Sequence, residues 1–198
     1  MKKMLITVVL AMVPMAALAQ NANELQRMFE AGKYQQVVET ASNDAQPAVL
    51  YTAAQSHQKL GATDQALQTY RRLAELPDND PWHFIGLSAQ QLLEGQNDPA
   101  VESARRAVEL AGDSPEAHYQ LGLALARREE WGEAATAFDR AADIDPSNAY
   151  ARYYGGLMHY RANRPDRMAT RFEQFLKLAP EAPERPEVLS IMKTIRGR

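Results

Sequence analysis

A repeat of about 34 residues constrains the fold of this chain more than any other feature of its sequence. The stretch Pro115–Asn148 holds two short amphipathic segments joined by a tight turn, and its pattern recurs on both sides. Shifting the window by whole periods places Ala134 on Ala66, Ala100 and Met168. A fixed period of this kind is typical of stacked helical hairpins, because each hairpin needs its neighbours to bury its apolar face.

The residues at fixed positions of this repeat resemble the tetratricopeptide repeat (TPR). That motif has Leu-Gly early, Ala and Phe in the middle and Pro near its end. The matching places hold Leu121, Gly122, Ala134, Phe138, Ala141 and Pro146. The resemblance covers residues 47–182 in four unbroken registers. It implies an all-α fold, a right-handed superhelical solenoid of antiparallel helical hairpins with a C-terminal capping helix.

The period predicts how the chain is divided. After a signal peptide (1–19) and a degenerate N-terminal hairpin (20–46), four repeats follow at 47–80, 81–114, 115–148 and 149–182, and a capping helix at 183–198 ends the chain. The first hairpin is shortened, since Gly32 and Gly61 lie closer together than one full period. Terminal units of a solenoid are often atypical because they cap the stack, and Val188, Ile191, Met192 and Ile195 give the last segment one apolar face.

The N-terminus has the layout of a secretory signal peptide. Lys2 and Lys3 precede an apolar run from Met4 to Ala19, which ends in a pattern of small residues, Ala17-Leu18-Ala19. We expect cleavage after Ala19 and a location in the bacterial periplasm, with no stable membrane insertion afterwards. The alternative is that the segment stays uncleaved and anchors the chain.

Composition excludes several classes of site. The chain has no cysteine, so it has neither disulfides nor thiolate metal ligands nor a Cys nucleophile. Its net charge of −3 lacks the basic footprint expected of a general nucleic-acid binder.

No recognisable catalytic or metal-binding motif accompanies the four histidines, His57, His83, His118 and His159. We therefore predict no catalytic, cofactor-binding or metal-ligating residue and no enzyme activity. A periplasmic enzyme is the least favoured reading, and it would require a pocket with two carboxylates or a His–carboxylate pair.

The resemblance implies that the first helix of each hairpin lines a concave groove. The predicted partner-binding residues of that groove are Tyr51, Gln55, Lys59, Trp82, Ile85, Tyr119, Leu123, Arg127, Tyr150, Tyr153, Leu157, Tyr160 and Arg161. Aromatic and Arg side chains commonly carry interface energy, although about half of these rings are expected to pack partly against neighbouring repeats. Some TPR domains grip a terminal carboxylate with Lys and Asn at two positions that here hold Tyr51 and Gln55, so that clamp is absent.

These observations favour a non-enzymatic scaffold of the bacterial envelope that binds a segment of a partner protein in its concave groove. The alternative is a self-associating adaptor component of a secretion or envelope-assembly complex, which predicts a homo-oligomer without any partner.

Overall fold

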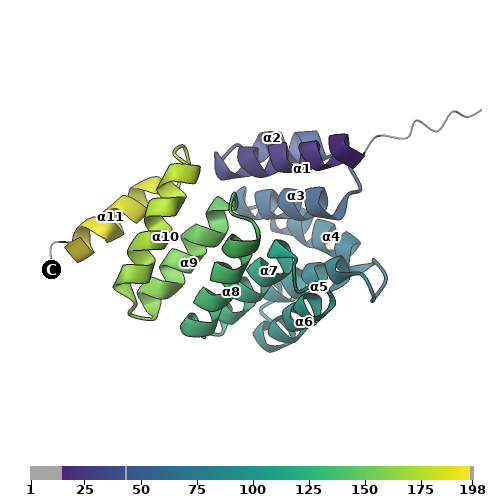
Figure 1. The fold of residues 1–198 in the computed structure, drawn as a ribbon. Helices are drawn as coiled ribbons and strands as arrows, with labels where there is room; N and C mark the ends of the chain where they lie inside the picture. Colours follow the sequence, from purple (N-terminus) through teal and green to yellow (C-terminus); the bar gives the residue numbers. More distant parts are fainter. Residues whose placement is uncertain (1–14, 43, 197–198) are drawn as a thin grey trace, which may run out of the picture.

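The computed structural model describes residues 15–42 and 44–196, which form eleven helices and no strand. They are α1 (Met15–Glu30), α2 (Tyr34–Ala41), α3 (Pro47–Lys59), α4 (Thr63–Ala74), α5 (Pro81–Leu93), α6 (Asn97–Leu110), α7 (Pro115–Arg127), α8 (Trp131–Ile144), α9 (Ala149–Arg161), α10 (Pro165–Leu178) and α11 (Arg185–Arg196). Consecutive helices pack against each other along the chain, which confirms the predicted solenoid of antiparallel hairpins (Figure 1).

The predicted signal peptide lies mostly outside the described residues, which begin at Met15. Helix α1 starts there and runs past the predicted cleavage point after Ala19. Within residues 15–42 and 44–196, no helix is long and apolar enough to span a membrane.

The turn inside each hairpin contains one residue with a left-handed backbone. Gly32, Gly61 and Gly95 have φ angles of 74°, 74° and 77°, and the later turns place Glu129 at 63° and Asn163 at 55°. The next amide closes the turn, as where Ala62 donates to the His57 carbonyl at 2.9 Å. This is the Schellman arrangement, which satisfies a carbonyl that the ending helix leaves free.

Small residues stand where the two helices of a hairpin cross. A Cβ atom built on Gly122 would lie 2.9 Å from the ring of Phe138, and one on Gly156 would lie 2.5 Å from the ring of Phe172. Both rings are completely buried. The glycines therefore let each ring pack directly on the backbone of the first helix.

The stack curves so that the first hairpin comes close to the end of α10, whereas α11 points away from it (Figure 1). The buried carboxylate of Glu30, at the end of α1, accepts a hydrogen bond from the Ala149 amide at the start of α9, at 3.0 Å. The rings of Phe29 and Tyr150 lie 5.0 Å apart. Contacts between the first hairpin and the fourth repeat thus close the concave side into a ring.

The segment between α10 and α11 completes this closure. The Lys59 ammonium lies 2.6 Å from the carboxylate of Glu184, which also accepts a hydrogen bond from the Tyr150 hydroxyl at 2.7 Å. A Cβ on Gly32 would lie 2.7 Å from the Pro183 ring. We call these contacts of Glu30, Lys59, Tyr150 and Glu184 the ring closure.

Helix α11 lies where the first helix of a further repeat would lie. The Tyr150 hydroxyl donates to Glu184 and the Tyr153 hydroxyl donates to Glu187 at 2.9 Å, so each tyrosine contacts the residue one period further along the chain. Val188 is fully buried and Met192 is 7% exposed. The helix therefore covers the end of the fourth repeat.

Candidate partner-binding site on the concave face

Helices α3, α5, α7 and α9 carry all the predicted groove residues, but the structure divides these residues by exposure. Five are buried, namely Tyr51, Ile85, Tyr119, Tyr150 and Tyr153. Gln55, Trp82, Leu123 and Leu157 are partly buried, and Lys59, Arg127, Tyr160 and Arg161 are exposed. The buried aromatic side chains therefore fill the middle of the concave face, whereas the exposed residues of the predicted set lie at the C-terminal ends of the helices.

A buried polar network joins three repeats beneath this face. The Tyr51 hydroxyl donates to the Gln120 side-chain carbonyl at 2.8 Å, and the Gln120 amide donates to the Ser88 hydroxyl at 3.1 Å. Ser88 in turn donates to the Ala100 carbonyl at 2.8 Å. Because buried polar groups are costly when unpaired, this network specifies how α3, α5 and α7 are placed.

Two separate cavities lie on the concave side. The larger has a volume of about 310 Å³, and we call it the chamber; the other has about 90 Å³. Phe29, Gln55 and Tyr119 line both and form the partition between them. The described residues thus divide the space that the sequence predicts as one groove.

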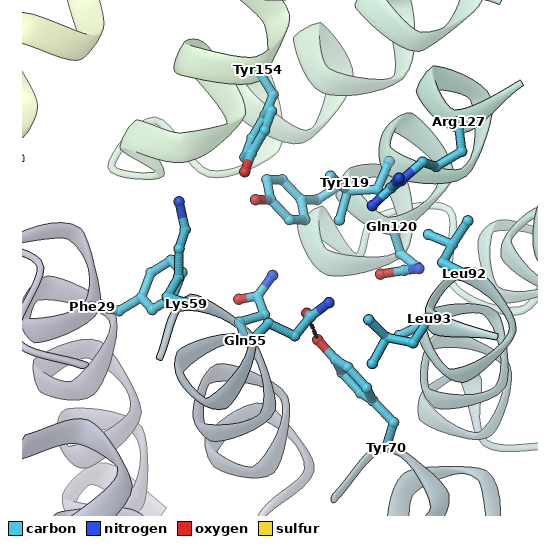
Figure 2. A pocket seen from close by; sticks show the side chains of 13 residues that line it. Phe29, Gln55, Lys59, Tyr70, Leu92, Leu93, Tyr119, Gln120, Arg127 and Tyr154 are labelled. Carbon is cyan, nitrogen blue, oxygen red and sulfur yellow. Dashed lines mark hydrogen bonds between the residues drawn. The ribbon is translucent and has the colours of Figure 1, made fainter. Parts of the chain in front are cut away.

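The chamber lies at the C-terminal ends of the first helices. Figure 2 shows its walls, which are made by Phe29, Gln55, Gln58, Lys59, Tyr70, Ala89, Leu92, Leu93, Tyr119, Gln120, Leu123, Arg127 and Tyr154. Among the described residues, this lining holds two cations and no carboxylate. The smaller cavity, at the opposite ends of these helices, is lined by Glu116 and Asp145 and by no cation of the described chain.

Helix dipoles explain the polarity of the two cavities. Lys59 and Arg127 end α3 and α7, where cations complement the partial negative charge of a helix C-terminus, and Glu116 lies in the first turn of α7. Burial lowers the pKa of Lys59, but Tyr154 and Glu184 outweigh burial, and the pKa is raised overall. Lys59 is therefore charged at neutral pH, and Glu184 pairs with it at 2.6 Å, whereas Arg127 has no ion pair with a described carboxylate.

Four residues of the chamber lining lie at no predicted groove position, namely Phe29, Tyr70, Gln120 and Tyr154. Gln58, Ala89, Leu92 and Leu93 stand at positions of the first helices that the resemblance places on the groove, although they are not in the predicted partner-binding set. Phe29 reaches the chamber because the first hairpin packs against Tyr150 of the fourth repeat, and Tyr70 comes from the second helix of its hairpin. The spacing of residues along one first helix could therefore not identify either of them. Gln120 directly follows the predicted residue Tyr119, and Tyr154 directly follows Tyr153. A glutamine within the apolar α7 was the sequence signal that could have identified Gln120.

The structure contains a His–carboxylate pair that the sequence does not reveal. His159 Nε2 lies 3.0 Å from Asp139, whose other carboxylate oxygen accepts from Arg171 Nε at 2.8 Å. Burial raises the pKa of Asp139, but its hydrogen bonds to His159 and Arg171 outweigh burial and lower it overall. His159 is completely buried and lines neither cavity, so the pair stabilises the packing of α8, α9 and α10. No cluster of three potential metal ligands occurs among the described residues.

Two family models, both described as tetratricopeptide repeat, match residues 48–79 and 94–149. The chain contains tetratricopeptide repeats. These matches fall on α3–α4 and on α6–α8, so they include Tyr51 and Gln120 of the polar network but not α5, which carries Ser88.

Two longer curated proteins are similar to part of this chain. The small glutamine-rich tetratricopeptide repeat-containing protein 2 of Mycosarcoma maydis is 30% identical over 97 residues, which are 48% of this chain and 28% of that protein. The cytochrome c-type biogenesis protein CycH of Bradyrhizobium diazoefficiens is 31% identical over 136 residues, which are 66% of this chain and 36% of that protein. The chain spans about a third of the length of these relatives.

Solved structures show the same fold. The thermophilic TPR protein TTC0263 of Thermus thermophilus superposes with a TM-score of 0.63 at 18% identity, over 87% of this chain and 97% of that one. YrrB, described as a TPR protein with an unusual peptide-binding site, gives 0.53 at 22% identity over 90% and 88%. The first TPR of Spaghetti bound to an HSP90 peptide gives 0.58 at 14% identity over 62% and 97%.

Proposed function

We propose that this protein is a non-enzymatic scaffold of the bacterial envelope whose concave face binds a segment of a partner protein. The observation that carries the proposal is the chamber, an open hollow with apolar, amide and cationic walls on the face that TPR helices present. Two of the similar structures, YrrB and the first TPR of Spaghetti, are described as peptide-binding.

The envelope location rests on the N-terminal sequence. Cleavage after Ala19 would keep Leu25, Phe29 and Glu30 in the mature chain, and these are the residues of α1 that are buried or that form the ring closure. N-terminal sequencing of protein from a periplasmic extract should begin within a residue or two of Gln20. Recovery of intact Met1 on membrane-bound material would replace this proposal with an anchored form.

Photo-crosslinking tests the binding face. A photoreactive residue at Leu123, in the chamber, should capture a partner in the envelope, whereas the same residue at Arg140, on the exposed side of α8, should not. Equal capture from both positions, or capture from Arg140 alone, would contradict binding on the concave face.

Self-association is a second candidate, and the surface of the last helix favours it. Leu189 of α11 is 46% exposed and Leu178 of α10 is 41% exposed, so apolar side chains are available on this surface. Light scattering on the purified chain distinguishes the two functions, since only self-association predicts a dimer in the absence of a partner.

A further inference from the structure

The chamber has hydrogen-bond donors that nothing in the described chain satisfies. Tyr119 is 6% exposed, yet its hydroxyl makes no hydrogen bond to any described residue, and the same holds for the partly buried Tyr154. Both hydroxyls reach the open space of the chamber, where a water or a ligand can pair with them. Figure 2 shows both hydroxyls pointing into the chamber.

Two cations face the same space. The ammonium of Lys59 uses one of its three donors on Glu184 and points to the side of the chamber where Tyr154 and Tyr119 lie (Figure 2). Arg127 reaches in from the end of α7, and its guanidinium forms no ion pair with any described carboxylate. Each of these groups can donate a hydrogen bond, and two of them are cations that cannot accept one, so a negatively charged acceptor is the complementary ligand atom.

The remaining wall is apolar and the space is small. Ala89, Leu92, Leu93 and Leu123 form a continuous apolar surface, and the partition at Phe29 closes the chamber towards the smaller cavity. A volume of about 310 Å³ is at the lower end of the range for small-molecule sites, roughly 300–1,000 Å³. It suits a compact apolar group and is too small for a helix.

We infer that the chamber binds a carboxylate carried on a compact apolar body, with the carboxylate at Tyr119, Tyr154, Lys59 and Arg127 and the body against the leucines. The inference rests on the proposed function in taking the concave face as the binding face. Such a carboxylate can belong to the last residue of a protein chain or to a free small acid, and the chemistry of recognition is shared.

N-acetyl-leucine and its neutral analogue N-acetyl-leucinamide are the probes. In methyl NMR spectra of the full chain, the acid should shift Leu92, Leu93 and Leu123, and the amide should bind about tenfold more weakly, because it cannot supply a charged acceptor. Equal binding of the amide would overturn the inference, as would the absence of any shift with the acid.

Tyrosine-to-phenylalanine changes test the hydroxyls without removing the rings. Tyr119→Phe with Tyr154→Phe should weaken binding of N-acetyl-leucine about tenfold, and Arg127→Gln should do the same. Arg128→Gln is the matched control outside the lining, and it should leave binding unchanged. Unaltered affinity in folded Tyr119→Phe/Tyr154→Phe protein would also overturn the inference.

A peptide that ends in Gly-Ser-Gly-Leu with a free carboxylate distinguishes the two sources. Tighter binding than N-acetyl-leucine assigns the chamber to a chain terminus, and weaker binding assigns it to a free acid. The photo-crosslinking experiment is independent of these probes. Crosslinking without binding of N-acetyl-leucine would refute only the chamber ligand, whereas binding without crosslinking would refute only the partner-binding function.

Discussion

At the scale of single residues, the hairpin turns show how a backbone requirement overrides the preferred residue. Glu129 occupies the left-handed position that Gly61 and Gly95 hold in the preceding repeats. A side chain in this conformation costs roughly 1–2 kcal/mol, because its Cβ crowds the following carbonyl. The Schellman hydrogen bond from Glu130 to the Leu125 carbonyl, at 3.0 Å, stabilises the turn nevertheless.

Glycine at this turn should therefore stabilise the protein. We expect Glu129→Gly to raise the free energy of unfolding by about 0.5–1 kcal/mol, after the greater freedom of glycine in the unfolded chain is subtracted. Gly95→Ala is the reciprocal change. Nothing lies within 4 Å of a Cβ at Gly95, so any loss there is conformational. Denaturant unfolding measures both, and a destabilised Glu129→Gly would show that its carboxylate matters more than its backbone.

At the scale of secondary structure elements, the crossing of α9 and α10 depends on one of two adjacent glycines. A Cβ on Gly156 would lie 2.5 Å from the ring of Phe172, whereas one on Gly155 would lie 3.4 Å from Asp139 Oδ1. Only Gly156 is therefore at the close approach of the two helices.

Alanine at these two positions should have opposite effects. Gly156→Ala should lower the free energy of unfolding by about 1–3 kcal/mol, because the ring of Phe172 cannot move without disturbing the core. Gly155→Ala should be neutral or stabilising, since alanine favours the helix by up to about 1 kcal/mol. Thermal unfolding of the two variants, side by side, checks this difference. Equal losses would place both glycines at the crossing.

Helix α11 offers a second matched pair. Within this helix, the side chain of Val188 is fully buried, whereas that of Leu189, the next residue, is 46% exposed. We expect Val188→Ala to cost about 2 kcal/mol from the lost methyl groups and the cavity, and Leu189→Ala to cost little. Calorimetry on the full chain provides the measurement. If Val188→Ala unfolded at the parent temperature, α11 would not contribute to the stability of the last repeat.

At the scale of the whole molecule, the ring closure holds a buried carboxylate at the start of a distant helix. Glu30 accepts hydrogen bonds from the Ala149 amide and from the Gln26 side chain, at 3.0 and 3.1 Å. Burial nevertheless dominates and raises the pKa of Glu30 above 4.5. The folded chain therefore binds this proton more tightly than the unfolded chain does.

This shift predicts how the closure responds to pH. The pKa of Glu30 in the folded chain lies above its ordinary value of 4.5. As the pH falls between these two pKa values, protonation of Glu30 stabilises the folded chain relative to the unfolded chain. This stabilisation is lost as the pH rises through the raised pKa. Glu30→Gln keeps both acceptor contacts without the charge, so it should melt higher than the parent at neutral pH. The difference should shrink in acid. Glu39→Gln, at an exposed position, is the control, and a pH-independent difference would contradict a buried charge at the closure.

The sequence by itself determined the repeating part of this protein. The period of the repeat predicted the all-α solenoid, and the small residues at Gly122 and Gly156 follow from the crossing of two helices within one hairpin. These features depend on contacts between residues close in sequence. Local periodicity is therefore sufficient to reveal them.

Only the tertiary structure decided the shape of the concave face. Four predicted groove residues are buried by the curvature of the solenoid, namely Tyr51, Tyr119, Tyr150 and Tyr153. Partner binding by the exposed groove residues, Lys59, Arg127, Tyr160 and Arg161, stays a prediction. Curvature is the sum of small rotations between successive repeats, and no single repeat encodes it. Contacts such as Glu30 to Ala149, 119 residues apart, then decide where the ring closes and leave the chamber as the open space.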